Sequence, residues 1–150
     1  MGNQIANVTE LTLAQEVERM KPSTLHLVNQ PLKNKLERDG LASFGSRASV
    51  PATDQWIRGR VVTLLSQYFV GATSDNVMRG IAADWVFELN GLPEWALQDA
   101  CRWWMSKDNP QRKRKPLAGD ISDRAYQEMV IVRAAKNAVE KFDKNVGVEL

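Results

Sequence analysis

The sequence holds few side chains that could carry out catalysis. It contains one histidine, His26, and one cysteine, Cys101. A Ser–His or Cys–His nucleophilic pair would have to use His26, which stands in a proline-punctuated stretch with no partner evident in the sequence. One cysteine allows neither an intrachain disulfide nor a thiolate cluster for a metal. Cys101 falls on the expected apolar side of a helix, which predicts a small buried hydrophobic residue.

Four carboxylates stand close together in the sequence, at Asp84, Glu88, Glu94 and Asp99. Asp84 and Glu88 are four residues apart and would share one helix face. No histidine is near them, and the spacing is not that of a metal site, so a solvated face is the better interpretation. No Walker-type phosphate loop occurs either. We therefore predict no catalytic residue, no metal site and no bound cofactor, and a protein that is not an enzyme.

Positive charge is concentrated in one short segment. Residues 110–119 carry four basic and no acidic side chains, although the whole chain has a net charge of only +2. Such a loop can bind phosphates through salt-sensitive contacts or meet an acidic protein surface, and a purely solvated loop is the alternative. A net charge near zero argues against general coating of nucleic acid. The residues predicted to contact nucleic acid or an acidic partner are Arg102, Lys107, Arg112, Lys113, Arg114 and Lys115.

Two adjacent tryptophans, Trp103 and Trp104, precede the basic segment. Neighbouring residues of a helix point about 100° apart, so Trp103 lies toward the edge of the core if Trp104 enters it. Trp103 could then form a partner surface, or a platform for stacked bases beside Arg102. Partial burial is the alternative, because tryptophan is usually mostly buried.

The elements that would position these residues are helical. From Thr53 onward, apolar residues recur at three- and four-residue spacings, and Thr53, Ser74 and Asp120 are predicted helix N-caps. One apolar stripe runs from Ile121 to Phe142 and predicts a single long helix. The sequence thus predicts an all-α bundle of about four helices, roughly at 54–70, 75–90, 93–106 and 121–143. The predicted core residues are Ile57, Val61, Leu64, Tyr68, Ile81, Trp85, Leu89, Leu97, Trp104, Met129, Val132 and Val139.

The first third of the chain lacks a sustained apolar period. Residues 11–20 predict a short helix that ends before Pro22, and prolines and glycines punctuate residues 21–52. We therefore expect an irregular, mobile N-terminal arm over residues 1–52 with one short helix, followed by a helical bundle domain over residues 53–150.

The composition is that of an ordinary globular protein, with 43% hydrophobic and 25% charged residues. No stretch approaches the ~20 apolar residues that span a bilayer, and the N-terminus lacks the basic start and apolar core of a secretory signal. We expect a cytoplasmic protein without a membrane partner.

Part of the helical region resembles a known family. The segments LLSQYF, ADWVFELNGLPEWALQDACRWWMSKDN and RKPLAGDI, within roughly residues 57–125, are similar to the helical domain of phage replicative-helicase loader and inhibitor proteins. That family's pattern runs W-x-x-x-L, then A-x-x-x-[YW], then P-[TP]-x-x-D-I. The matching residues here are Trp85 and Leu89, then Ala100 and Trp104, then Pro116, Asp120 and Ile121.

The resemblance implies a non-catalytic phage or prophage protein of DNA replication in a bacterial host. Its expected partner is a DnaB-type replicative helicase, with DNA as a possible second partner through residues 112–115. In the family the helical domain is N-terminal and a flexible C-terminal segment engages the helicase. Here about 50 residues precede the domain and the C-terminus predicts a strong helix, so no helicase-binding residue is carried over.

Two other classes of function remain open. Helices 75–90 and 93–106, joined by a short turn, could form a helix-turn-helix that regulates transcription, although Glu94 and Asp99 suit a reading helix poorly. A virion structural or assembly protein is the further alternative, with the last helix as its oligomerisation seam.

Overall fold

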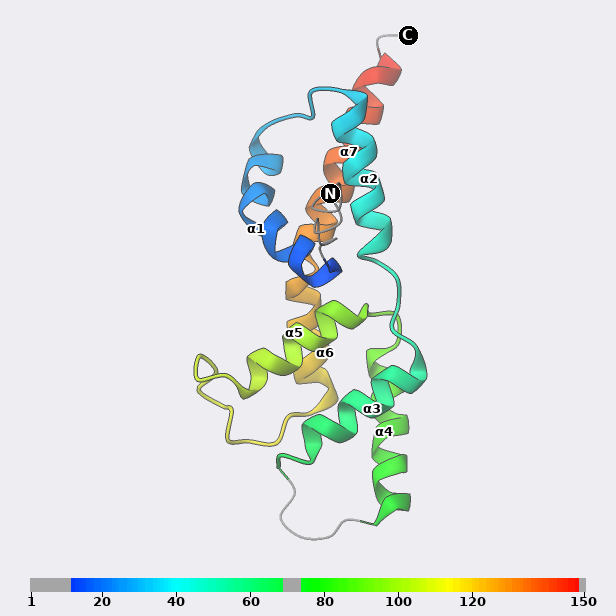
Figure 1. Cartoon of the computed structure of the whole chain (residues 1–150), viewed down its shortest axis with the longest axis vertical. Coiled ribbons are helices and arrows are strands. Elements are labelled where there is room, and N and C mark those ends of the chain that lie inside the picture. Colours follow the sequence, from blue (N-terminus) through cyan, green and yellow to red (C-terminus); the bar gives the residue numbers. More distant parts are fainter. Residues whose placement is uncertain (1–11, 69–73, 149–150) are drawn as a thin grey trace, which may run out of the picture. The chain divides into compact units, whose positions relative to one another are not determined.

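The computed structural model describes the backbone of residues 12–68 and 74–148, and the side chains of these residues except 22–29 and 148 (Figure 1). Within the described residues the chain is all-α, as predicted, but it forms seven helices rather than about four. They are α1 (Leu13–Asn29), α2 (Lys35–Arg47), α3 (Asp54–Leu65), α4 (Asp75–Leu89), α5 (Glu94–Met105), α6 (Ala118–Glu128) and α7 (Val130–Val148). None of them has the length and apolar composition that a bilayer-spanning segment requires.

The chain separates into two compact units, with boundaries after Ala48 and after Arg133. The first unit comprises the described residues up to Ala48 together with those from Ala134 onward, and the second comprises Ser49–Arg133. This division differs from the predicted one, in which a single domain ran from residue 53 to residue 150. Most of α7 belongs with the N-terminal helices.

The expectation of an irregular N-terminal arm is corrected by α1 and α2. At the start of α1, the Thr12 hydroxyl accepts from the Gln15 backbone N–H at 3.2 Å, and the Gln15 amide oxygen accepts from the Thr12 N–H at 3.0 Å. This reciprocal pair is a capping box. The helix continues through Pro22, which was expected to end it. Proline removes one backbone hydrogen bond from the interior of this helix.

A second capping signal starts α2. The Asn34 side chain accepts from the Glu37 backbone N–H at 2.9 Å, and the Glu37 carboxylate accepts from the Lys33 N–H at 2.9 Å. The Asn-x-x-Glu spacing is readable in the sequence. The helix was missed because Gly40 and Gly45 interrupt its apolar pattern.

The first unit is held by buried apolar side chains and by ion pairs between its helices. Arg47 of α2 pairs with Glu16 of α1 at 2.6 Å, and Arg38 of α2 pairs with Asp143 of α7 at 2.8 Å. Among the described side chains of this unit, the buried apolar residues are Val17, Leu41, Phe44, Ala48, Ala135 and Ala138.

The second unit has the larger core. In it, α3 packs against α4, α5 packs against α6, and α4 also contacts α6 (Figure 1). Eight of the twelve predicted core residues in the chain are buried, and the four half-buried ones are Tyr68, Ile81, Met129 and Val139. Thr53 and Ser74 cap α3 and α4 as predicted. The helix expected over 54–70 ends at Leu65, and residues 69–73 lie outside the described residues.

The predicted single helix over 121–143 is wrong, because the chain breaks it at Met129. There the Met129 N–H donates to the carbonyls of Ala125 and Tyr126, and α7 starts afresh at Val130. The Arg133 guanidinium also donates to the Tyr126 carbonyl at 3.1 Å, so this carbonyl accepts from a side chain as well as from the Met129 N–H. The β-branched run Val130–Val132 lowers helix propensity at this point.

The short turn between α4 and α5 depends on Gly91, which has a φ of +92°. Replacing it by alanine, Gly91→Ala, forces a side chain into the left-handed region and is expected to lower the free energy of unfolding by about 1–2 kcal/mol. Urea denaturation measures the difference. The matched control is Gly80→Ala within α4, where an added Cβ meets nothing within 4 Å. This control is expected to be stabilising by about 0.5–1 kcal/mol, and equal effects of the two substitutions would contradict the turn geometry.

Candidate functional site

The predicted cations lie mainly in residues 106–117, the segment between α5 and α6 that is called the basic loop below. Side chains of the second unit hold its backbone. The Tyr68 hydroxyl donates to the Arg112 carbonyl at 2.8 Å, and the Trp104 indole N–H donates to the Arg114 carbonyl at 3.1 Å. Two carbonyls within three residues are thus directed inward. These two hydrogen bonds hold the backbone of the basic loop from within the chain.

Asn109 anchors the start of the basic loop. Its side chain is only 2% exposed, and its amide nitrogen donates to the Trp104 carbonyl at 2.8 Å. Its amide oxygen accepts from the Gln111 backbone N–H at 3.0 Å. Asn109 therefore satisfies a carbonyl near the C-terminal end of α5 and fixes the following turn.

Arg114 is engaged within the chain. Its guanidinium donates to the Asp120 carboxylate and to the Gln111 side-chain oxygen, at 3.2 Å in each case. The Cζ atom lies 5.0 Å from the ring centroid of Trp104, a cation–π contact. Of the predicted contact residues, Arg114 is the one whose charge is most clearly used to shape the loop.

Asp120 is not the N-cap that the sequence predicted. The helix α6 begins at Ala118, so Asp120 is the third helical residue rather than the N-cap. Its carboxylate accepts from the Leu117 backbone N–H at 2.8 Å as well as from Arg114. Asp120 therefore links the end of the basic loop to the first turn of α6.

The other predicted cations have exposed side chains. The Arg112 guanidinium folds back and donates to the Lys107 carbonyl at 3.2 Å, which places it against the backbone at the start of the loop. Asp108 is the one acidic residue between Arg102 and Leu117. The exposed predicted residues are Arg102 on α5 and Lys107, Arg112, Lys113 and Lys115 in the basic loop.

Trp103 is half-buried at the end of α5. The Arg124 guanidinium of α6 covers one face of its ring, with Cζ 4.3 Å from the centroid, and Glu128 holds this guanidinium at 3.1 Å. The edge contact with Trp104 has a centroid distance of 6.4 Å and an interplanar angle of 68°. The face that Arg124 covers is closed to a stacked base.

Sequence reasoning missed three of the residues that form the site. Tyr68 was expected in the core, Asn109 was not singled out, and Arg124 was not considered. Tyr68 and Arg112 are 44 residues apart, so no local pattern could have connected them. The Asn109–Pro110 pair is a readable turn signal.

The other candidate groups do not form a reactive site in the described residues. Cys101 is buried, as predicted, and burial raises the pKa of its thiol to about 11, so it is protonated at neutral pH. The Glu88 carboxylate accepts from the Ser122 hydroxyl at 3.4 Å, and Asp84 and Glu94 are exposed. No group of three His, Cys, Asp or Glu side chains that could hold a metal occurs there. The His26 side chain lies outside the described residues.

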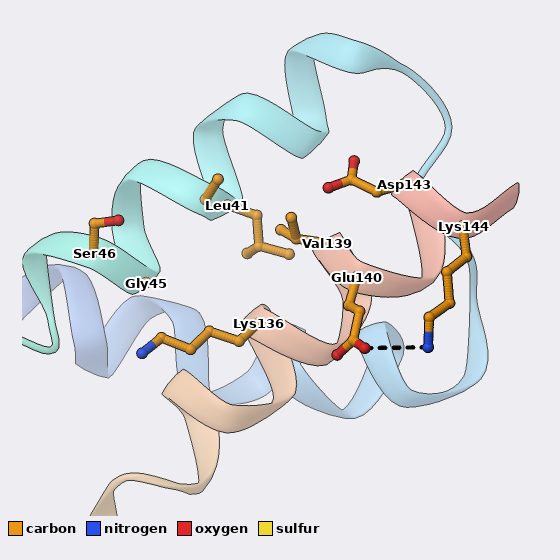
Figure 2. Close-up of a pocket in the computed structure, with 9 residues that line it drawn as sticks. Leu41, Gly45, Ser46, Lys136, Val139, Glu140, Asp143 and Lys144 are labelled. Atoms are coloured by element: carbon orange, nitrogen blue, oxygen red, sulfur yellow. Dashed lines mark ion pairs between the residues drawn. The ribbon is translucent and has the colours of Figure 1, made fainter. Parts of the chain in front are cut away.

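The first unit contains a separate groove between α2 and α7, with a volume of about 490 Å³ (Figure 2). Leu41 and Val139 point toward each other across it. Three charged residues of its rim are paired: Lys144 contacts Glu140 at 3.1 Å, and Asp143 is bound by Arg38. Lys136 adds a further cation to the lining of this apolar groove.

No protein-family model, curated protein or solved structure matches the chain. The candidate site is therefore defined by its own geometry, a basic loop whose backbone is held from within.

The first prediction for the site concerns Asn109. The substitution Asn109→Ala leaves the Trp104 carbonyl without its buried donor and is expected to lower the free energy of unfolding by about 1–3 kcal/mol. It should also raise the amide hydrogen exchange of residues 107–115 in particular. The matched control is Asn76→Ala on the exposed side of α4, which should change stability by less than about 0.5 kcal/mol. Unchanged exchange in the loop of Asn109→Ala would contradict the anchoring role.

The second prediction concerns the ion pair beside the groove. Arg38 donates to both Asp143 oxygens, at 3.0 and 2.8 Å, and so lowers the pKa of that carboxyl. Because the folded-state pKa is depressed, the pairing stabilises the fold above the ordinary aspartate pKa of about 3.9 and is lost as the pH falls through the lowered value. In Arg38→Gln, an NMR titration should show the Asp143 pKa returning to the ordinary range. Lys33→Gln, an exposed control on the same unit, should leave it low, and a low value in Arg38→Gln would rule out this cause.

Proposed function

We propose that this chain is a non-catalytic accessory protein of phage or prophage DNA replication that binds a DnaB-type replicative helicase, as a loader or an inhibitor. The observation that carries the proposal is the basic loop, whose carbonyls are held by Tyr68 and Trp104 while the side chains of Lys107, Arg112, Lys113 and Lys115 are exposed. In this proposal the loop contacts an anionic surface of the helicase–DNA assembly.

The order of the loop is what makes a binding role favourable. A flexible loop loses conformational entropy when it binds, and that loss reduces affinity. Here hydrogen bonds from Tyr68, Trp104 and Asn109 have already restricted the backbone. The like charges of the adjacent exposed residues Arg112 and Lys113 repel one another, so holding them side by side costs free energy. A functional contact gives a reason for keeping them.

The residues of the family resemblance are structural residues of the second unit. All of them lie in the second unit, where they have core or capping roles. They therefore describe how one compact unit folds, and a partner must be recognised by residues outside the pattern. The core residues among them are Trp85, Leu89, Ala100, Trp104, Pro116 and Ile121.

The two alternative functions receive no comparable support. As a reading helix, α5 would present the exposed carboxylate of Glu94 at its N-terminal end, and its Gln98 amide oxygen already accepts from Arg60 at 2.7 Å. As an oligomerisation seam, the last apolar stripe is divided at Met129, and Ala135 is fully buried within the single chain.

The proposal is tested by the mass of the complex. Light scattering of the purified protein mixed with the replicative helicase should give a mass above that of the helicase alone at low salt, and a second measurement at about 0.3 M salt distinguishes the kind of contact. A contact that buries apolar surface survives such screening, whereas a purely electrostatic contact does not. An unrelated hexameric ATPase of similar net charge is the control. The absence of a complex with the helicase at either salt concentration would overturn the proposal.

A further inference from the structure

The cations of the basic loop differ in their contacts within the chain, and this difference points to one kind of ligand. We propose that Lys107, Arg112 and Lys113 bind the phosphate backbone of DNA, that Arg114 positions the loop, and that the contact reads no bases. This inference rests on the proposed function and deepens it by naming the anionic surface.

The three phosphate-binding cations are all exposed, and one hydrogen bond joins the Arg112 side chain to the Lys107 backbone. Arg112 donates through one guanidinium nitrogen to the Lys107 carbonyl, and its other N–H groups keep their donor capacity. Lys113 follows directly and has an exposed side chain. Tyr68 and Trp104 hold the Arg112 and Arg114 carbonyls inward, so a ligand that approaches the loop meets its side chains.

The composition of the loop favours DNA over an acidic protein face. Protein–protein interfaces are depleted in lysine and are centred on apolar or aromatic side chains, whereas DNA interfaces are strongly positive. Between Lys107 and Lys115, Pro110 is the one apolar side chain, and five of the nine residues are basic. Phosphates spaced along a duplex match such a set of cations without requiring an apolar centre.

The amide and aromatic side chains that could read bases are engaged within the chain. Asparagine and glutamine read adenine through their amides, but Asn109 is buried on the Trp104 carbonyl and Gln111 accepts from Arg114. Aromatic rings stack on unpaired bases, but Arg124 covers a face of Trp103 and Trp104 is buried. Binding should therefore depend little on sequence and should show no preference based on stacking for single strands.

Arg114 acts differently from the three binding cations. Its guanidinium forms an ion pair with the Asp120 carboxylate and lies against the Trp104 ring. Loss of this side chain should loosen the loop without removing a phosphate contact. Arg114→Gln is therefore expected to weaken DNA binding at every salt concentration while leaving the salt slope unchanged.

The test is fluorescence anisotropy of the full chain with a short labelled DNA duplex, in two unrelated sequences, between about 0.05 and 0.3 M salt. Each phosphate contact contributes about 0.9 to the slope of log K against log salt concentration, so three contacts predict a slope near −2.7. Lys113→Gln and Lys107→Gln should each reduce its magnitude by about 0.9, and the double variant should leave about −0.9. The matched control is Lys33→Gln, an exposed lysine of the first unit, which should leave the slope unchanged.

The outcomes separate this inference from the proposed function. Binding with the expected slope and its loss in the lysine variants supports the inference, even if no helicase complex forms. No DNA binding, together with a helicase complex that Lys113→Gln weakens, would assign the loop to an acidic protein surface and overturn the inference alone. Equal slopes for Lys113→Gln and Lys33→Gln, or a strong dependence on sequence, would also overturn it.

Discussion

The indole of Trp104 connects the core of the second unit to the basic loop. Its side chain is 3% exposed, its N–H donates to the Arg114 carbonyl, and its ring carries the Arg114 guanidinium. Its own carbonyl accepts from Asn109. A buried indole N–H without a partner would cost free energy, so the core is well satisfied only when the loop lies in this conformation. Folding of the unit and ordering of the loop are thereby coupled.

The two units are stabilised in different ways. The second unit buries large apolar side chains from four helices, including Trp85, Trp95 and Trp104. Among its described side chains the first unit buries Val17, Leu41, Phe44 and three alanines, and it adds ion pairs between its helices, such as Arg38 with Asp143. Exposed ion pairs contribute little on average. The candidate binding surface lies on the second unit, whose large buried side chains suit a site that must keep its geometry.

Much of the second unit could be predicted from the sequence, because its signals are local. Thr53 and Ser74 stand one residue before their helices, and the apolar spacing places Ile57, Trp85 and Leu97 inward. The first unit was predicted only in part, as a short helix over residues 11–20, although Thr12-x-x-Gln15 and Asn34-x-x-Glu37 are also local signals. Pro22 and Gly40 were given too much weight as signals that end a helix.

The amino-acid sequence by itself determined the all-α class, the capping residues and the position of the cationic run between Pro110 and Pro116. These features depend on residue type and on spacings of a few residues. The tertiary structure alone decided which cations face outward and which are used internally. Arg114 and Lys113 are adjacent and both are basic, yet only Arg114 meets Trp104, Gln111 and Asp120. The difference comes from contacts such as the one between Tyr68 and Arg112, which join residues far apart in the chain and exist only once the helices have packed.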